Sequence, residues 1–225
     1  PRERQLPFLR RRGAGAAADM GDRELRTQLE KTIGQLDLLD SSWLRSGAKR
    51  ADAVARIEVS GEYGTGFLVS PWLLMTNHHV LPDAKAAHGA EVTFRYENDA
   101  RRRITRSRVV RLDPERCFVT SPEEKLDYTV VAVQALEEKT PGDVFGWIGL
   151  DGGIGKVLVG NPVNIVQHPG GEPRQVAFRN NLLMQIEDER FLVYETDTQG
   201  GSSGAPVFND RWELVALHKG AESAR

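Results

Sequence analysis

The residues best suited to covalent chemistry form a glycine-rich segment with two serines near the end of the sequence. It reads Gly-Gly-Ser-Ser-Gly-Ala-Pro over residues 200–206. A serine nucleophile needs an exposed hydroxyl and nearby backbone N–H groups that can bind a developing oxyanion, and glycines permit the dihedral angles that turn such groups inward. We predict Ser203 as the nucleophile, with the N–H groups of Gly201 and Ser203 as the oxyanion hole. A glycine-rich turn between strands is the simpler alternative for this segment taken alone.

A histidine that could activate this serine lies in the segment Thr-Asn-His-His-Val, residues 76–80, after the apolar run Trp-Leu-Leu-Met. A histidine at the end of a strand can take the proton of a serine hydroxyl as a general base, and we predict this role for His79. The adjacent His78 raises the alternative of a metal site. However, neighbouring side chains diverge on a strand and no third ligand has a suitable spacing, so we expect no metal.

An aspartate that could orient this histidine opens the apolar run 128–133. A carboxylate in such a place is costly to bury without a hydrogen-bond donor, and a histidine N–H is a donor whose tautomer the pairing fixes. An exposed aspartate at a strand end is the simpler alternative for Asp127 alone. Because His79, Asp127 and Ser203 occur together in this chain order, each at the end of an expected strand, they favour a catalytic triad.

The elements that must position these residues are short apolar runs separated by Gly, Pro, Asn and Asp. The runs cover residues 54–59, 66–69, 72–76, 91–96, 107–112, 128–133, 163–167, 175–179, 191–194, 205–208 and 214–218. Such spacing predicts an all-β sandwich or barrel. The sequence His-Pro-Gly-Gly-Glu-Pro, residues 168–173, predicts a hairpin turn.

The chain before residue 53 differs from the rest in composition and in the spacing of its apolar residues. Residues 1–20 are rich in Arg, Gly and Ala, which predicts a disordered tail. Residues 22–45 are expected to form a helix that starts at Asp22 and packs on the rest of the chain. Its apolar stripe consists of Leu25, Leu29, Ile33 and Leu36.

Composition excludes several classes of protein. The 225 residues carry a formal net charge of −2, so bulk charge does not favour nucleic acid as a partner. The single cysteine, Cys117, excludes an intrachain disulfide and is expected to be a small buried residue. No apolar run is long enough to cross a bilayer and no signal peptide is visible, which slightly favours the cytoplasm. The chain begins with Pro1, so we expect a fragment, a processed product or an incomplete translation, with Met20 as a possible start.

Three segments resemble the bacterial trypsin-like serine peptidases that lack disulfides, in particular the glutamyl-endopeptidase branch. They read GTGFLVSPWLLMTNHHVL, LDYTVVAV and YETDTQGGSSGAPVFNDRWELVALHKG, within residues 53–220. The resemblance implies two packed six-stranded antiparallel β-barrels of the chymotrypsin-like kind, a catalytic cleft between them, and hydrolysis of peptides or proteins without a cofactor. It implies His79, Asp127 and Ser203 as the triad, with Gly201 in the oxyanion hole.

The resemblance also sets the expected division of the chain. The expected parts are a basic tail (1–20), a helical segment (21–52), a first barrel with His79 and Asp127 (53–140) and a second barrel with Ser203 (141–225). Members of the family continue beyond the segment that matches LVALHKG, whereas this sequence stops five residues after Gly220. We therefore expect the last strand of the second barrel to be missing and an edge to be open.

Two sets of residues disagree on the side chain that precedes the cleaved bond. Asp197 stands where trypsin carries the aspartate of its specificity pocket, which would attract Lys or Arg. Thr198 and His218 match the residues with which glutamyl endopeptidases hold an acidic side chain. Two like charges at about 4 Å cost roughly 4 kcal/mol at an effective dielectric constant near 20, so Asp197 would oppose an acidic substrate unless His218 is protonated. We expect a basic residue, with an acidic residue as the alternative.

Two other functions are considered. An α/β-hydrolase would use Ser202 in the pattern Gly-x-Ser-x-Gly, but the acid and histidine it needs downstream do not fit into the remaining residues. A non-catalytic binding module on a protease fold would usually lack a triad residue, and here all three are present. Neither the natural substrate nor the oligomeric state is indicated.

Overall fold

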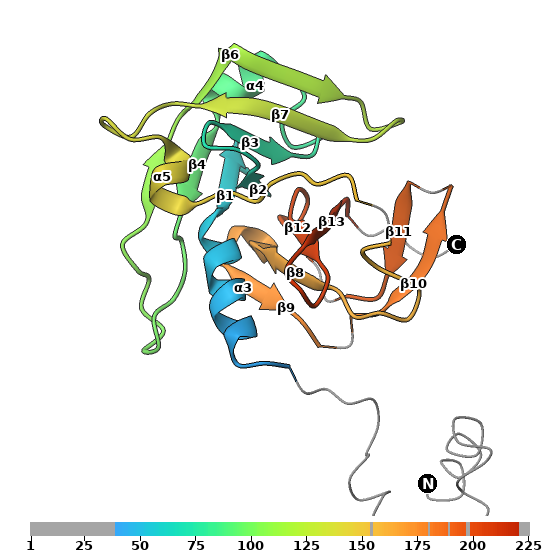
Figure 1. Cartoon of the computed structure of the whole chain (residues 1–225). Coiled ribbons are helices and arrows are strands. Elements are labelled where there is room, and N and C mark those ends of the chain that lie inside the picture. The colour runs from blue at the N-terminus through green and yellow to red at the C-terminus, as the bar shows by residue number, and fades with distance from the viewer. Residues whose placement is uncertain (1–38, 154, 180, 189, 197–198, 221–225) are drawn as a thin grey trace, which may run out of the picture. The chain divides into compact units, whose positions relative to one another are not determined.

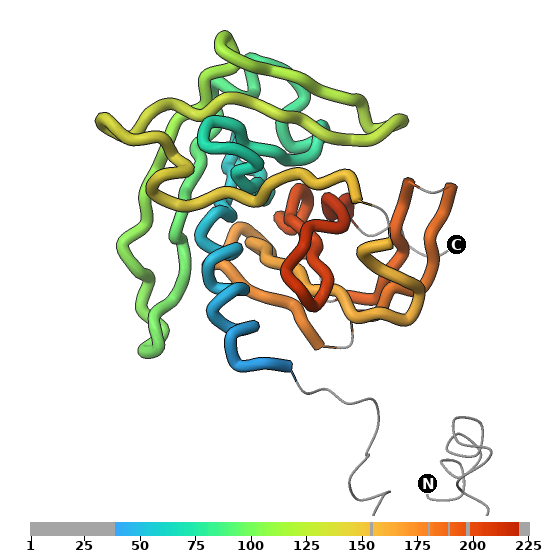
Figure 2. The backbone as a smooth tube through the Cα atoms, in the orientation of Figure 1, coloured from blue at the N-terminus to red at the C-terminus, as the bar shows by residue number. Residues whose placement is uncertain are grey.

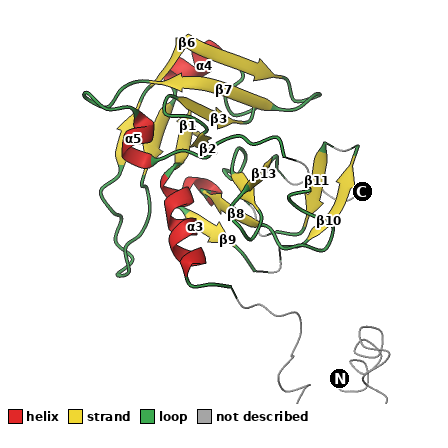
Figure 3. Cartoon of the chain, in the orientation of Figure 1, coloured by secondary structure: helices red, strands yellow, loops and turns green. Residues whose placement is uncertain are grey.

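The computed structural model describes residues 39–153, 155–179, 181–188, 190–196 and 199–220. The expected tail (1–20) and most of the expected helix (22–45) lie outside these ranges. The chain divides into two units, Pro1–Asp40 and Ser41–Arg225, and every helix and strand described below belongs to the second. Strands and loops dominate this unit, and its helices are short (Figure 3).

The first half of the unit forms one antiparallel sheet with the strand order β5-β4-β1-β2-β3-β7-β6 (Figure 1). Its strands are β1 (Val54–Val59), β2 (Glu62–Leu68), β3 (Leu73–Thr76), β4 (Glu91–Phe94), β5 (Arg108–Val110), β6 (Leu112–Ser121) and β7 (Tyr128–Val133). All six pairings are antiparallel. The sheet therefore brings the end of β3, before His79, beside the start of β7, after Asp127.

The second half contains a four-stranded antiparallel sheet of order β13-β12-β8-β9 and a separate pair, β10-β11. The strands are β8 (Asn164–Gln167), β9 (Gln175–Ala177), β10 (Leu183–Glu187), β11 (Phe191–Tyr194), β12 (Pro206–Phe208) and β13 (Leu214–Leu217). The predicted all-β class with two β parts is confirmed, with seven strands in the first sheet and two separate sheets in the second part. Among the described strands, β13 pairs with β12 alone, so it forms an edge.

Buried apolar residues from neighbouring strands fill the space around the first sheet. Fully buried examples, one from each of five strands, are Ile57, Phe67, Leu74, Phe94 and Val131. A short helix, α5 (Pro141–Phe145), follows β7 and stacks the ring of Phe145 on that of Phe94 at a centroid distance of 4.2 Å. After α5 the chain passes to the second part, as the tube in Figure 2 shows. A smaller apolar cluster of Val163, Ile165, Ala205 and Val207 lies there and supports the segment that carries Ser203.

The helix before the first strand is α3 (Ser42–Asp52). The sequence predicts a helix end near Arg45, but α3 continues for two further turns, and Leu39 and Asp40 before it are not helical. The polar composition of residues 45–52 concealed this extension, because only Gly47 and Ala51 of that stretch are buried.

Tight packing against Trp212 explains why α3 lies where it does. A Cβ atom on Gly47 would lie 2.3 Å from the indole ring of Trp212, so only glycine permits this approach. The indole N–H of Trp212 donates to the carbonyl of Trp43 at 3.0 Å. Another short helix, α4 (Ala84–Gly89), is capped by Asp83, which accepts a hydrogen bond from the backbone N–H of Ala86. A single 3-10 turn, η1 (Pro169–Gly171), follows β8.

Candidate active site

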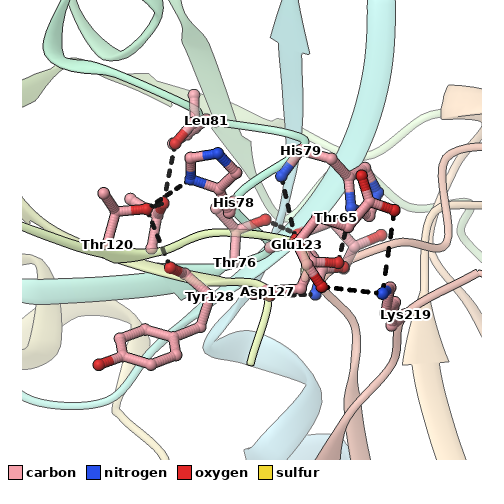
Figure 4. A network of polar contacts seen from close by, with 12 residues as sticks. Thr65, Thr76, His78, His79, Leu81, Thr120, Glu123, Asp127, Tyr128 and Lys219 are labelled. Carbon is pink, nitrogen blue, oxygen red and sulfur yellow. Dashed lines mark hydrogen bonds and ion pairs between the residues drawn. The ribbon is translucent and has the colours of Figure 1, made fainter. Parts of the chain in front are cut away.

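The structure brings His79 and Asp127 together. The Nδ1 atom of His79 lies 2.8 Å from Oδ2 of Asp127, and the backbone N–H of His79 donates to Oδ1 at 3.1 Å (Figure 4). The carboxylate side chain is 1 % exposed, whereas the imidazole is 34 % exposed. A buried carboxylate that accepts both bonds orients the ring and fixes the proton on Nδ1, which leaves Nε2 to act as a base.

The local sequence holds Asp127 in this position. Its φ angle is +48°, a left-handed conformation that aspartate tolerates better than most residues. The carbonyl of Asp127 accepts a hydrogen bond at 2.8 Å from the side-chain amide of Asn77, which is buried. Its backbone N–H donates to the carbonyl of Pro122 at 3.1 Å, closing a turn. The adjacent His78 instead contacts Thr120, with 2.8 Å between Nδ1 and Oγ1.

The segment with Ser203 belongs to the second part of the fold but is bonded to the first. The carbonyl of Ser203 accepts a hydrogen bond from the backbone N–H of Thr65 in β2 at 2.8 Å. A Cβ atom added to Gly204 would lie 2.0 Å from the carbonyl oxygen of Thr65 and 2.3 Å from Oγ1 of Thr76. Since Thr76 ends the strand that leads to His79, this contact sets the serine segment against the histidine segment.

The two serines of the segment differ in exposure. Ser202 is 1 % exposed, and its hydroxyl accepts a weak hydrogen bond from the N–H of Gln199 at 3.4 Å. Ser203 is only partly buried. Among the described residues, the hydroxyl of Ser203 forms no hydrogen bond to His79. The difference in exposure favours Ser203 over Ser202 as the group that can meet a substrate.

Backbone N–H groups around Ser203 are available for an oxyanion. Gly201 has a φ angle of +92°, the left-handed region that favours glycine. The N–H groups of Ser202, Gly204 and Ala205 all donate to backbone carbonyls. By contrast, the N–H groups of Gly201 and Ser203 have no acceptor within the described part of the chain. Two free donors flanking a serine can bind the oxygen of a tetrahedral intermediate.

Of the three residues expected to determine substrate preference, only His218 is described, and Asp197 and Thr198 lie outside the described residues. His218 is 5 % exposed and follows β13. Its Nδ1 atom lies 2.6 Å from the hydroxyl oxygen of Tyr194. Burial, together with the nearby charge of His79, lowers the pKa of His218 from 6.5 to about 4. His218 is therefore neutral at pH 7.

The Tyr194 hydroxyl decides which nitrogen of His218 carries the proton. Burial raises the pKa of Tyr194 above its usual value, so the phenol keeps its proton. No other partner for this hydroxyl is present among the described residues, so its hydrogen points to Nδ1. The Nε2 atom then carries the ring proton, and in the described structure this buried N–H has no acceptor.

An ion pair lies beside His79. The ammonium group of Lys219, just after His218, lies 3.8 Å from a carboxylate oxygen of Glu123 and donates to its carbonyl at 3.3 Å (Figure 4). Candidate ligand atoms of His79, Glu123 and Asp127 lie within 4.8 Å of one another, which is the spacing a metal ion needs. Because Asp127 already accepts two bonds from His79 and Glu123 pairs with Lys219, we assign these groups to hydrogen bonding.

Several residues of this region have no signal in the sequence. Asn77, Thr65 and Tyr194 contact partners 50, 136 and 24 positions away, so no local pattern reveals the contacts. The position of Asn77 two residues before His79, directly after a buried strand end, is the one hint that it contacts the aspartate.

The fold is that of chymotrypsin-like serine peptidases. Structures of the Rv3671c protease from Mycobacterium tuberculosis H37Rv superpose with a TM-score of 0.54: the inactive form at 21% identity over 81% of this chain and 85% of that chain, and its Ser343Ala mutant at 19% identity over 81% and 82%. A crystal structure of Deg5 superposes with the same TM-score at 14% identity, covering 88% of this chain and 86% of that one. At these identities the likeness concerns the fold.

The sequence itself shows the family. The model of the trypsin-like peptidase domain matches residues 64–217, so the chain belongs to the trypsin-like peptidases. It is also 41% identical over 228 residues to the uncharacterized protein y4fB of Sinorhizobium fredii, a match that covers 95% of this chain and 33% of that protein. The chain thus spans about a third of this relative. None of the described helices has the length and apolar content that crossing a bilayer requires.

Proposed function

We propose that the chain is a serine endopeptidase that cleaves peptide bonds through an acyl-enzyme, with His79, Asp127 and Ser203 as its triad. The observation that carries the proposal is the 2.8 Å contact between Nδ1 of His79 and the buried carboxylate of Asp127. It is joined by a partly exposed serine, Ser203, and by the N–H groups of Gly201 and Ser203, which have no acceptor among the described residues. Membership of the trypsin-like peptidases supports the same chemistry.

The proposed reaction has two halves. In the first, Oγ of Ser203 attacks the carbonyl carbon of the substrate while Nε2 of His79 takes the hydroxyl proton. The negative oxygen that forms lies between the N–H groups of Gly201 and Ser203. The C–N bond then breaks, and the leaving amine takes the proton from His79. In the second half, water attacks the ester by the same route and releases the acid and the free serine.

We propose further that the residue before the cleaved bond carries an acceptor oxygen, as in the glutamyl-endopeptidase branch. Neutral His218 holds a buried N–H on Nε2 that lacks a partner among the described residues, and leaving such a donor unpaired costs about 1–3 kcal/mol. A carboxylate or amide of the substrate would satisfy this donor, whereas Lys and Arg offer only donors. The donor on His218 thus favours an acceptor side chain in place of the basic residue expected from Asp197 alone.

The test of the reaction is hydrolysis of a protein substrate such as casein by the full chain and its variants. Ser203→Ala and His79→Ala should each lower kcat by about four decades or more, because the triad acts as a unit. His78→Ala, the matched control, should stay within a few fold, since His78 contacts Thr120 and not Asp127. Loss of activity in His78→Ala alone would show that the wrong histidine is assigned.

The test of the substrate class is a peptide library cleaved by the wild-type chain and by Asp197→Ser. We expect Glu, Asp or Gln before the cleaved bond in both proteins. A preference for Lys or Arg that disappears in Asp197→Ser would overturn this part of the proposal and leave the endopeptidase assignment intact.

A further inference from the structure

Thr65 is a buried residue in the middle of β2 and bonds to three other segments of the chain. It is 0 % exposed. Its hydroxyl donates to the carbonyl of Gly201 at 2.8 Å and accepts from the N–H of His168 at 3.1 Å. Its backbone N–H donates to the carbonyl of Ser203 at 2.8 Å, and its carbonyl accepts from the hydroxyl of Thr76 at 2.7 Å. One side chain thus connects the first sheet, the 168–171 turn and the serine segment.

The bonds of the serine segment fix the direction of each peptide unit. In a trans peptide the C=O and the following N–H point in opposite directions. The carbonyl of Gly200 accepts from the N–H of Gly170 at 2.5 Å, which turns the N–H of Gly201 the other way. The carbonyl of Ser202 accepts from Ala205 at 3.0 Å, which does the same for the N–H of Ser203.

Thr65 holds the two peptide units that alternate with these. Its hydroxyl binds the carbonyl of Gly201, and the opposite N–H, that of Ser202, donates to Gln199 at 3.1 Å. Its backbone N–H binds the carbonyl of Ser203. Rotation of either unit would turn the free donors of Gly201 and Ser203 out of position.

We propose that Thr65 is a positioning residue for the oxyanion hole, and that its hydroxyl holds the N–H groups of Gly201 and Ser203 in the direction that binds a substrate oxyanion. The inference rests on the proposed endopeptidase function. Thr65 does not touch the reacting atoms, and it acts through the carbonyl of Gly201 and through the turn that begins at His168.

The 168–171 turn depends on the same hydroxyl. A Cβ atom on Gly201 would lie 2.7 Å from the carbonyl of His168 and 2.9 Å from the nitrogen of Gly171, so the loop and the turn are in direct contact. A hydroxyl can donate to Gly201 and accept from His168 at once, whereas a methyl group can do neither. Valine at position 65 keeps the shape and leaves both buried groups unpaired.

The experiment compares Thr65→Val, Thr65→Ser and a matched control in the full chain. The control is Thr93→Val: Thr93 is also buried in the first sheet, at 3 % exposure, and its hydroxyl has no hydrogen-bond partner in the described structure. We expect Thr65→Val to lower kcat by about 10- to 100-fold with KM within threefold, because loss of one oxyanion donor lowers kcat by about 10²–10³. Thr65→Ser and Thr93→Val should stay within threefold of the wild type.

A second measurement does not depend on activity. Amide hydrogen exchange, read by NMR, should be at least tenfold faster in Thr65→Val at His168 and Gly170, while amides of the first sheet such as that of Leu68 keep their rates. Thr65→Ser should restore both slow amides. If Thr65→Val does not fold, Thr65→Ala takes its place.

Three outcomes would overturn the inference: an unchanged kcat in Thr65→Val, unchanged exchange at His168 and Gly170, or faster exchange throughout the sheet, which would show a general structural role. If the wild-type chain shows no hydrolysis that depends on Ser203, the proposed function fails, and the exchange rates alone decide whether the Thr65 hydroxyl holds the loop.

Discussion

Asp127 and His79 are hydrogen-bonded to each other but differ in burial. The carboxylate is 1 % exposed and accepts hydrogen bonds from both the backbone and the ring of His79, while the ring itself is 34 % exposed. Burying a charged carboxylate away from water is costly unless hydrogen-bond donors such as these contact it. The ring itself stays partly exposed, as the proposed role of His79 as a base requires.

The substitution Tyr194→Phe tests which ring nitrogen of His218 carries the proton. Without the phenol, Nδ1 loses its donor and the ring is free to adopt the other tautomer, in which Nε2 has no hydrogen. We expect kcat/KM for a peptide with Glu before the cleaved bond to fall by about tenfold. A peptide with Leu at that position should be cleaved as before. Tyr63→Phe, which changes a tyrosine that is 40 % exposed, is the control.

Equal losses for the Glu and Leu peptides in Tyr194→Phe would contradict this account of substrate preference. They would show that Tyr194 supports the fold of β11 in general, and that His218 does not bind the acidic side chain of the substrate.

The pairing of His79 with Asp127 could be predicted from the sequence because each follows or precedes a recognisable apolar strand, and the sheet brings the two strand ends together. Thr65 and Tyr194 could not be predicted in the same way. Threonine is common in strands and tyrosine is common at partly buried positions, so neither residue type signals a polar contact with a distant segment.

Among the elements, the close packing between the serine segment and β2 and β3 depends on Gly204. Gly204 and Gly61 share a φ angle of +87°, but only Gly204 has neighbours: a Cβ atom there would lie 2.0 Å from the carbonyl oxygen of Thr65, whereas nothing lies within 4 Å at Gly61. A residue with a Cβ atom would therefore strain the backbone at both positions, but it would clash with neighbouring atoms only at Gly204.

We expect Gly61→Ala to lower the free energy of unfolding by about 1–2 kcal/mol, the usual cost of a left-handed backbone for a residue with a Cβ atom. Gly204→Ala should cost at least 3 kcal/mol, because the backbone of β2 must move as well. Urea denaturation followed by circular dichroism measures both. Equal losses in the two variants would show that the serine segment does not press against β2.

Two strands, β6 and β10, are not predicted by the pattern of apolar runs, for physical reasons. β6 contains Pro114 and several charged residues, and its pairing with β7 shifts register between Asp113 and Phe118, as at a bulge, where proline is tolerated. β10 buries only Leu183 and pairs with β11 alone, so its sequence lacks an apolar face. Cys117 in β6 is half-buried, not fully buried as its apolar neighbours indicate.

For the molecule as a whole, two buried histidines make stability depend on pH. Burial lowers the pKa of His168 from 6.5 to about 4, and the positive charges of Arg174 and Arg56 act in the same direction. His218 is lowered to about 4 as well. Between these values and 6.5 the unfolded chain binds more protons than the folded chain, so the free energy of unfolding must fall as the pH falls.

The expected loss between pH 7 and pH 4 is at most about 3 kcal/mol for each histidine, from 1.36 kcal/mol for each unit of pKa. His168→Asn keeps a donor for the carbonyl of Glu172, which lies 3.0 Å from Nδ1 of His168, and removes the titrating group. Urea titrations at several pH values should show a smaller pH dependence in His168→Asn. The control, His78→Asn at a half-buried position, should keep the wild-type dependence. An identical dependence in all three proteins would contradict the assignment.

The central claim is that Ser203 is a nucleophile activated by His79, and covalent labelling tests it most directly. A fluorophosphonate probe reacts with an activated serine and forms a stable ester, which mass spectrometry of the digested protein locates. We predict labelling of the full-length wild-type chain at Ser203, with loss of labelling in His79→Ala and in Asp127→Ala. A folded wild-type chain that is not labelled would contradict the claim and favour a binding module on a protease fold, and labelling at Ser202 would show that the nucleophile is wrongly assigned.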